Sequence, residues 1–83
     1  MKYTWHDAGL KAFGNRLREL RKMRGLSQEE LAWKADSELS QISRMERGII
    51  NAGLSQVFKI AEALEIPAKE LFDFILEKQE DGS

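Results

Sequence analysis

LSQEELAWKADSELSQISRMERG, residues 26–48 of this 83-residue chain, is the stretch that decides the fold. Ser27 followed three residues later by Glu30 forms a capping box, in which each side chain binds a backbone N–H group near the start of a helix. A first short helix is therefore expected to begin at Gln28. Its apolar face consists of Leu31, Ala32 and Ala35.

A turn and a second short helix follow in the same stretch. Asp36 and Ser37 favour side-chain to backbone hydrogen bonds over helix continuation, and they predict the turn. Ser37 is also expected to cap the second helix. This helix should run from about Glu38 to Arg47 and stop at Gly48, a residue suited to the position just after a helix.

The two faces of the second helix differ in character. Ile42 and Met45 lie three residues apart and should face the core. Two helices joined by a short turn, the second with a polar and mostly uncharged outer face, match the helix-turn-helix plan, in which the second helix enters the major groove of DNA. The expected outer face consists of Glu38, Leu39, Ser40, Gln41, Ser43 and Arg44.

Three segments, RLRELRKMRGLSQEELA, ISRMERG and FKIAEALEIPAKELF, resemble the lambda-repressor-like family of helix-turn-helix proteins, of the Cro and xenobiotic-response-element type. The resemblance covers roughly residues 13–72. It implies an all-α, five-helix DNA-binding domain with the helix-turn-helix at its second and third helices. It also implies a small transcription regulator of bacterial or phage type, such as a repressor. The lack of cysteine and of any membrane-length apolar run makes the cytoplasm the expected location.

The remaining elements follow from helical spacing and from the helix start and stop residues. Neither strand-like alternation nor an internal repeat interrupts the pattern, so one all-α domain is expected over residues 8–78. The expected elements are an N-terminal arm over 1–7, a helix capped by Asp7 that ends near Arg24, a helix over Leu54–Leu64, a helix from Pro67 to about Lys78, and a frayed tail over 79–83.

Composition excludes several classes of function. The chain has no cysteine and one histidine, so it lacks thiolate metal ligands and a base beside a nucleophile. No apolar run approaches the roughly 18 residues of a membrane-spanning helix. We therefore expect no catalysis, no cofactor, no metal and no membrane contact, and nothing implies a small-molecule ligand.

The charge of the chain is unevenly distributed. The formal net charge is −1, but residues 1–47 hold ten Lys and Arg against seven Asp and Glu, whereas residues 48–83 hold three against seven. The half that contains the helix-turn-helix is therefore basic, which suits a nucleic-acid partner. Because the excess is small, DNA binding should depend only modestly on salt.

Individual residues can be assigned to DNA contacts. For each of them, the alternative is an ordinary helix residue that faces solvent. Gln28 should bind a backbone phosphate, assisted by the Ser27 N–H, with Arg16 or Lys22 as further phosphate contacts. Arg44 is expected to make two hydrogen bonds to guanine. The full set is Ser27, Gln28, Glu38, Leu39, Ser40, Gln41, Ser43, Arg44, Arg47 and Asn51.

The resemblance implies one structural ion pair. In the similar fold, the residues that match Arg21 and Glu46 form a semi-buried salt bridge between the first helix and the recognition helix. Breaking one partner of such a pair would destabilise the domain. Trp33, which lies off the apolar stripe of its helix, receives no site role.

The end of the chain is too apolar for one core-facing stripe, because five large apolar residues fall within the six positions 71–76. Either the last helix wraps irregularly or it pairs with a second copy, and a twofold homodimer is the preferred interpretation. The expected interface consists of Ile49, Ile50, Phe72, Phe74, Ile75 and Leu76.

The predicted function is that of a homodimeric transcription regulator that binds a near-palindromic site on double-stranded DNA. Two alternatives share the fold. One is an antitoxin that binds DNA and also a partner protein, although the tail EKQEDGS is short for that task. The other is the controller protein of a restriction-modification system, which the small size of the chain suggests.

Overall fold

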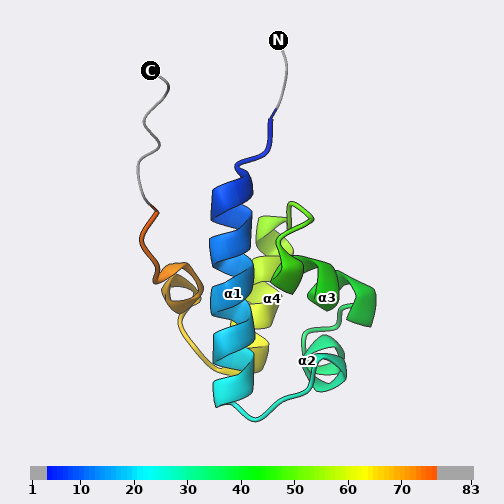
Figure 1. Ribbon diagram of the computed structural model, residues 1–83. Helices are drawn as coiled ribbons and strands as arrows, with labels where there is room; N and C mark the ends of the chain where they lie inside the picture. The colour runs from blue at the N-terminus through cyan, green and yellow to red at the C-terminus, as the bar shows by residue number, and fades with distance from the viewer. Residues whose placement is uncertain (1–3, 77–83) are drawn as a thin grey trace, which may run out of the picture.

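A computed structural model describes residues 4–76 of the chain. Figure 1 shows an all-α arrangement in which residues 4–76 contain no strand, as the sequence predicts. The elements are α1 (Asp7–Met23), α2 (Gln28–Lys34), α3 (Leu39–Arg47), α4 (Leu54–Leu64) and the 3-10 helix η1 (Ala68–Phe72). Within these residues, no helix combines the length and the apolar character needed to cross a membrane.

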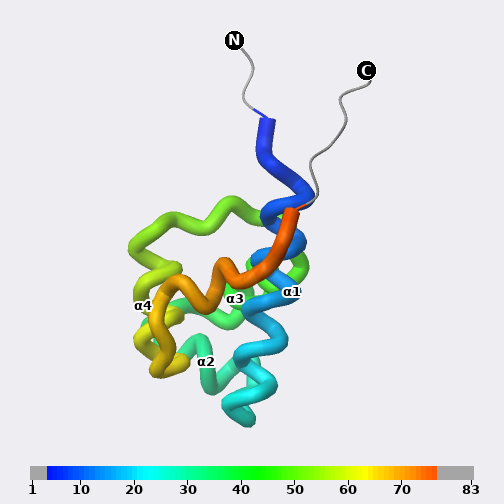
Figure 2. Tube along the Cα trace, turned by 90° about the vertical axis from the view of Figure 1, so that its left-hand side faces the viewer, coloured from blue at the N-terminus to red at the C-terminus, as the bar shows by residue number. Residues whose placement is uncertain are grey.

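One apolar core joins all five elements. α3 packs against α1 and α2, while η1 lies against both α1 and α4. Figure 2 shows the chain after α4 crossing the molecule towards the N-terminal part of α1. Because each element contributes to the core, the core-facing side of the helix-turn-helix is packed against the rest of the domain. The fully buried apolar side chains are Leu17, Leu31, Ile42, Met45, Ile60, Leu64 and Leu71.

Two glycines let α1 and the end of α3 approach closely. A Cβ atom added to Gly14 would lie 2.4 Å from the Met45 carbonyl oxygen. Gly48 has a φ of +71°, and a Cβ there would lie 2.7 Å from the Lys11 Cα atom. Backbone therefore packs on backbone at this crossing, which fixes the position of α3 on α1.

The helix-turn-helix boundaries agree closely with the sequence. The capping box is confirmed, since the Ser27 hydroxyl accepts from the Glu30 N–H at 3.0 Å and Glu30 accepts from the Ser27 N–H at 2.8 Å. The turn at Asp36 is also confirmed, with a φ of +52° there. The Ser37 N–H closes the turn by donating to the Ala32 carbonyl at 2.9 Å.

Two predicted caps are wrong. His6, not Asp7, caps α1, and its Nδ1 accepts from the Gly9 N–H at 2.9 Å, because Asp7 already lies inside the first turn. α3 begins after Glu38, which makes no side-chain cap hydrogen bond. Ser37 does not cap α3 because its hydroxyl pairs with Gln56 Nε2 at 2.8 Å, which ties the turn to α4.

The predicted last helix from Pro67 is wrong beyond Phe72. In an α-helix the Glu70 carbonyl would accept from the N–H of Phe74. Instead, Arg16 Nε donates to that carbonyl at 2.8 Å, and the Phe74 N–H donates to the Phe72 carbonyl. The segment therefore continues without helix to Leu76, and the predicted end near Lys78 and the tail over 79–83 lie outside the described residues.

Candidate nucleic-acid interface

α3 presents a polar flank to solvent. Ile42 and Met45 are buried beneath it, with exposures of 0% and 2%, and Gly14 receives its last turn. On the opposite side, the predicted contact residues divide by exposure: Glu38, Leu39, Ser40, Arg44 and Arg47 are exposed, and Gln41 and Ser43 are half-buried. This face carries exposed side-chain donors of the kind that read bases in a major groove.

The arginines of the flank are available for a ligand. Arg44 is exposed, and Arg47 makes one long hydrogen bond from its Nε to the Ser43 carbonyl at 3.4 Å. Leu39 is 44% exposed, which leaves apolar surface at the first turn of α3. The flank therefore combines cationic donors with one apolar tip, and both kinds of group contact bases.

The predicted phosphate contacts at the start of α2 are already engaged within the protein. The Ser27 N–H donates to the Glu30 carboxylate, and this backbone bond holds the pKa of Glu30 below its usual value. Gln28 Nε2 donates to Glu46 Oε1 at 2.9 Å. Asn51, the remaining candidate, lies exposed in the loop between α3 and α4. Of the two Gln28 amide donors, one N–H is left for another acceptor.

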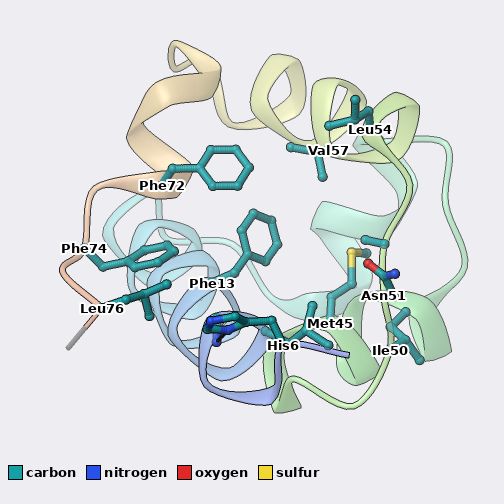
Figure 3. A pocket seen from close by; sticks show the side chains of 13 residues that line it. His6, Phe13, Met45, Ile50, Asn51, Leu54, Val57, Phe72, Phe74 and Leu76 are labelled. Atoms are coloured by element: carbon teal, nitrogen blue, oxygen red, sulfur yellow. Dashed lines mark hydrogen bonds between the residues drawn. The ribbon is translucent and has the colours of Figure 1, made fainter. Parts of the chain in front are cut away.

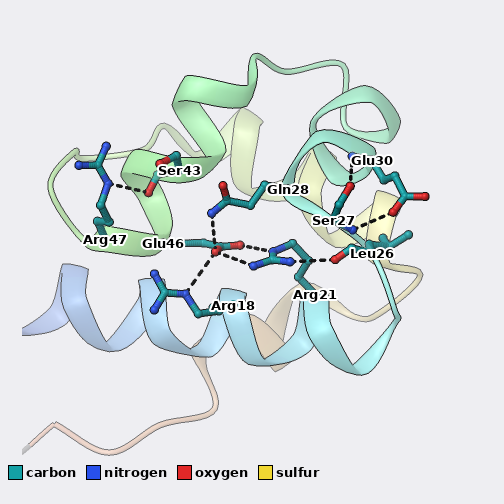
Figure 4. A network of polar contacts seen from close by, with 9 residues as sticks. All are labelled: Arg18, Arg21, Leu26, Ser27, Gln28, Glu30, Ser43, Glu46 and Arg47. Atoms are coloured by element: carbon teal, nitrogen blue, oxygen red, sulfur yellow. Dashed lines mark hydrogen bonds and ion pairs between the residues drawn. The ribbon is translucent and has the colours of Figure 1, made fainter.

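Glu46 lies at the centre of a polar network between α1, α2 and α3 (Figure 4). Its side chain is fully buried, and Arg21 binds it twice, with Nε 2.5 Å from Oε2 and Nη2 3.0 Å from Oε1. Arg21 Nη1 also donates to the Leu26 carbonyl at 2.8 Å. The structure thus places in contact the two residues that the family resemblance pairs.

Arg18 is the member of this network that sequence reasoning missed. Its Nε lies 3.3 Å from Glu46 Oε1, so three side chains share that oxygen. Burial alone would raise the pKa of Glu46, but the hydrogen bonds from Arg21, Gln28 and Arg18 outweigh it and hold the pKa below its usual value. The signal in the sequence was the spacing of Arg18 and Arg21, which share a helix face at i, i+3.

Arg16, a suggested phosphate contact, is directed elsewhere. Its guanidinium binds the Glu19 carboxylate at 2.6 Å and the Glu70 carboxylate at 3.1 Å. The hydrogen bond that Arg16 donates to Glu19 raises the pKa of Arg16. Arg16 therefore fastens η1 to α1, and the groups suggested for a phosphate are engaged within the protein.

An apolar groove of about 340 Å³ lies between α1, the loop after α3, the start of α4 and the end of the described chain (Figure 3). Four of the six predicted dimer residues line it: Ile50, Phe72, Phe74 and Leu76. The other two point outward, with Ile49 49% and Ile75 92% exposed. The predicted interface residues thus form a groove and an exposed apolar rim.

Comparison with known proteins identifies similar chains. The sequence profile of HTH_3, described as Helix-turn-helix, matches residues 17–71. The control protein C.BamHI of Bacillus amyloliquefaciens is 40% identical over 63 residues, which cover 75% of this chain and 78% of that protein.

Solved structures include two similar controller proteins. The restriction-modification controller protein C.AhdI from Aeromonas hydrophila is 48% identical, with a TM-score of 0.77 over 78% of this chain and 98% of the other. The wild-type restriction-modification controller protein C.Esp1396I is 26% identical, with a TM-score of 0.71 over 77% and 84% of the two chains.

Proposed function

Since the chain belongs to the HTH_3 helix-turn-helix family of DNA-binding transcriptional regulators, we propose that it is the controller protein of a restriction-modification system. The observation that carries this proposal is the 48% identity to C.AhdI across 98% of that chain. From sequence alone this function was the alternative to a regulator of unspecified genes. The similarity now favours it over both that interpretation and the antitoxin. The family is non-enzymatic.

Base reading in this proposal belongs to the exposed flank of α3. Arg44 donates two hydrogen bonds to O6 and N7 of a guanine, a contact that discriminates against other bases by about 1 to 3 kcal/mol. Ser40 is small enough to let α3 approach the base edges closely, and Gln41 reads an adenine or a neighbouring phosphate. Leu39 contacts a thymine methyl group. The burial of Ile42 and Met45 supports this orientation.

Docking on the DNA backbone is proposed for residues around the flank. Arg47 and Asn51 are exposed, and Gln28 keeps one amide N–H beyond its bond to Glu46. Such phosphate contacts fix the register of the protein on the duplex and do not read sequence. The loop that carries Asn51 holds no basic residue between Ile49 and Gly53, so cationic contacts to the DNA backbone come from the helices.

The regulator is proposed to act as a twofold homodimer. The apolar groove and its rim leave large side chains in water, including Ile75 at 92% and Phe72 at 49% exposure. Fully burying one such side chain contributes about 1.5 to 3 kcal/mol, so pairing two copies of this surface is favourable. The two copies of α3 would then face half-sites about 34 Å apart on a near-palindromic operator.

Regulation follows from the linkage between pairing and DNA binding. Ligands that bind only the dimer shift the monomer–dimer equilibrium by mass action. Operator occupancy therefore rises steeply with the concentration of the protein itself. No small effector is needed for this control.

Selection of bound duplexes from a random DNA pool tests the proposal. We expect a near-palindromic site whose half-sites lie one helical turn apart, and the same site upstream of restriction-modification genes in the genome that encodes this chain. Arg44→Ala should lose the preference at one symmetric base position, whereas Arg24→Ala, directly after α1 and beside the end of α4, should keep it. A pool that shows no enrichment would refute DNA recognition, and a site absent from such genes would refute the controller assignment.

A further inference from the structure

We propose that Arg18 and Gln28 together clamp one phosphate of the DNA backbone, and that buried Glu46 positions both side chains for that contact. The inference rests on the proposed DNA binding. It adds a residue of α1 to the interface and gives Glu46 a second role beside its bond to Arg21.

The charges around Glu46 leave one cation in excess. Arg21 alone balances the charge of the Glu46 carboxylate, which it binds with two hydrogen bonds. Arg18 nevertheless binds the same carboxylate, so two guanidinium groups face one buried anion. The network therefore carries a net positive charge, and an anionic ligand beside Arg18 completes the balance.

The unused donors of the two side chains point to that ligand. The Arg18 guanidinium has five N–H groups, and within residues 4–76 only its Nε has a hydrogen-bond partner, while the side chain is 42% exposed. Figure 4 shows its Nε towards Glu46 and its terminal nitrogens turned away from the carboxylate. Gln28 Nε2 likewise has a second N–H beyond its bond to Glu46.

The geometry fits a single phosphate group. Arg18 Nε lies 3.3 Å and Gln28 Nε2 2.9 Å from the same Glu46 oxygen, so these nitrogens are within 6.2 Å of each other. Phosphate oxygens accept charge-assisted hydrogen bonds at about 2.8 Å, so one phosphate can bridge donors at this separation.

The position of the clamp identifies the phosphate as one of the DNA backbone. Glu46 directly precedes Arg47 in the last turn of α3, next to the flank proposed to read bases. A duplex that seats α3 in its major groove carries a phosphate strand along each side of that helix. The clamp then holds one of these strands at the junction of α1, α2 and α3.

The salt dependence of binding to a mixed-sequence duplex tests the contact. For Arg18→Ala we expect the slope of log K against log salt to fall by about 0.9 per protomer, and affinity near 0.1 M salt to fall about eightfold per protomer. The ranking of selected base sequences should stay unchanged, because a phosphate contact weakens all duplexes alike. Arg24→Ala removes the same charge just after α1, where Arg24 binds the Glu65 carbonyl, and should leave the slope unchanged.

Arg18→Lys tests the positioning by Glu46. Lysine carries its three donors on one nitrogen and lacks the planar fork of arginine, so it cannot hold Glu46 through one nitrogen while separate nitrogens face the phosphate. We expect it to recover less than half of the lost log K. Full recovery by lysine would overturn the positioning role, and an unchanged salt slope in Arg18→Ala would overturn the clamp. Failure of the wild-type protein to bind any duplex would instead refute the proposed function itself.

Discussion

Replacing Glu46 tests how strongly the buried network stabilises the domain. Its side chain has no exposure, and that of Arg21 has 10%. Glu46→Ala leaves the Arg21 guanidinium buried, with the Leu26 carbonyl as its remaining partner. Arg18 and Gln28 are more exposed and can turn to water, so the stranded charge of Arg21 dominates the loss.

The expected loss is about 3 to 5 kcal/mol, the cost of leaving one partner of a buried pair unpaired. A domain of 83 residues has a free energy of unfolding of about 4 to 12 kcal/mol. The melting temperature of Glu46→Ala should therefore fall by roughly 12 °C or more. Arg21→Ala should lose somewhat less, because Arg18 and Gln28 still bind Glu46.

The double variant Arg21→Met with Glu46→Leu distinguishes two causes of destabilisation. One is the cost of leaving a buried charge unpaired, and the other is the loss of the attraction between the two side chains. Apolar residues that replace both partners of a buried pair often restore stability. We expect this variant to be more stable in urea unfolding than either single alanine variant. Lys59→Ala is the control, since Lys59 pairs with an exposed Asp36 at 4.0 Å and should lose under about 1 kcal/mol. Single variants that lose less than about 1 kcal/mol, or a double variant that loses the sum, would refute the reasoning.

Three further predictions concern pH, backbone and pairing. Because the folded-state pKa of Glu46 is lowered, its contribution to stability is present above the unfolded pKa of about 4.3 and is lost as pH falls through the folded value. The free energy of unfolding of Glu46→Gln should therefore decline less steeply with falling pH than that of the wild-type protein. Gly25→Ala should lose about 1 to 2 kcal/mol of unfolding free energy through its left-handed φ of +70° alone. Gly48→Ala should lose clearly more in urea unfolding because its Cβ meets the backbone of α1. Equal losses in the two variants would contradict this. Ile75→Asp should weaken dimerisation in sedimentation without lowering the monomer's stability, whereas Met23→Asp, also an exposed apolar residue, should leave dimerisation unchanged.

The helix-turn-helix could be predicted because its signals are local. The capping box at Ser27 and Glu30 fixes the start of α2, and the boundaries Leu54–Leu64 of α4 follow from spacing. The alternation of buried Ile42 and Met45 with exposed polar residues follows from the helical period. These features depend on residues a few positions apart, which the sequence displays directly.

Two of the errors share a cause, which is a bond from a distant residue. Gln56 takes the Ser37 hydroxyl from across 19 positions, so Ser37 does not cap α3. Arg16 binds the Glu70 carbonyl from across 54 positions, at the place where η1 ends and periodicity predicted a longer helix. Neither bond leaves a local pattern in the sequence.

The candidate site divides in the same way. Exposure of the α3 flank follows from the helical period, whereas the engagement of Gln28 with Glu46 depends on how α2 packs against α3. Arg18 joins Glu46 only because Gly14 allows α1 and α3 to meet closely. Side-chain chemistry at a junction of three helices therefore required the structure.

Methylation interference at guanine N7 tests most directly whether α3 reads the major groove, where N7 is exposed. We predict that N7 methylation at two symmetric guanines, about one helical turn apart, blocks binding of the wild-type protein, and that Arg44→Ala is insensitive at those positions. Binding that tolerates N7 methylation throughout the selected site, while methylation at adenine N3 in the minor groove abolishes it, would contradict the account.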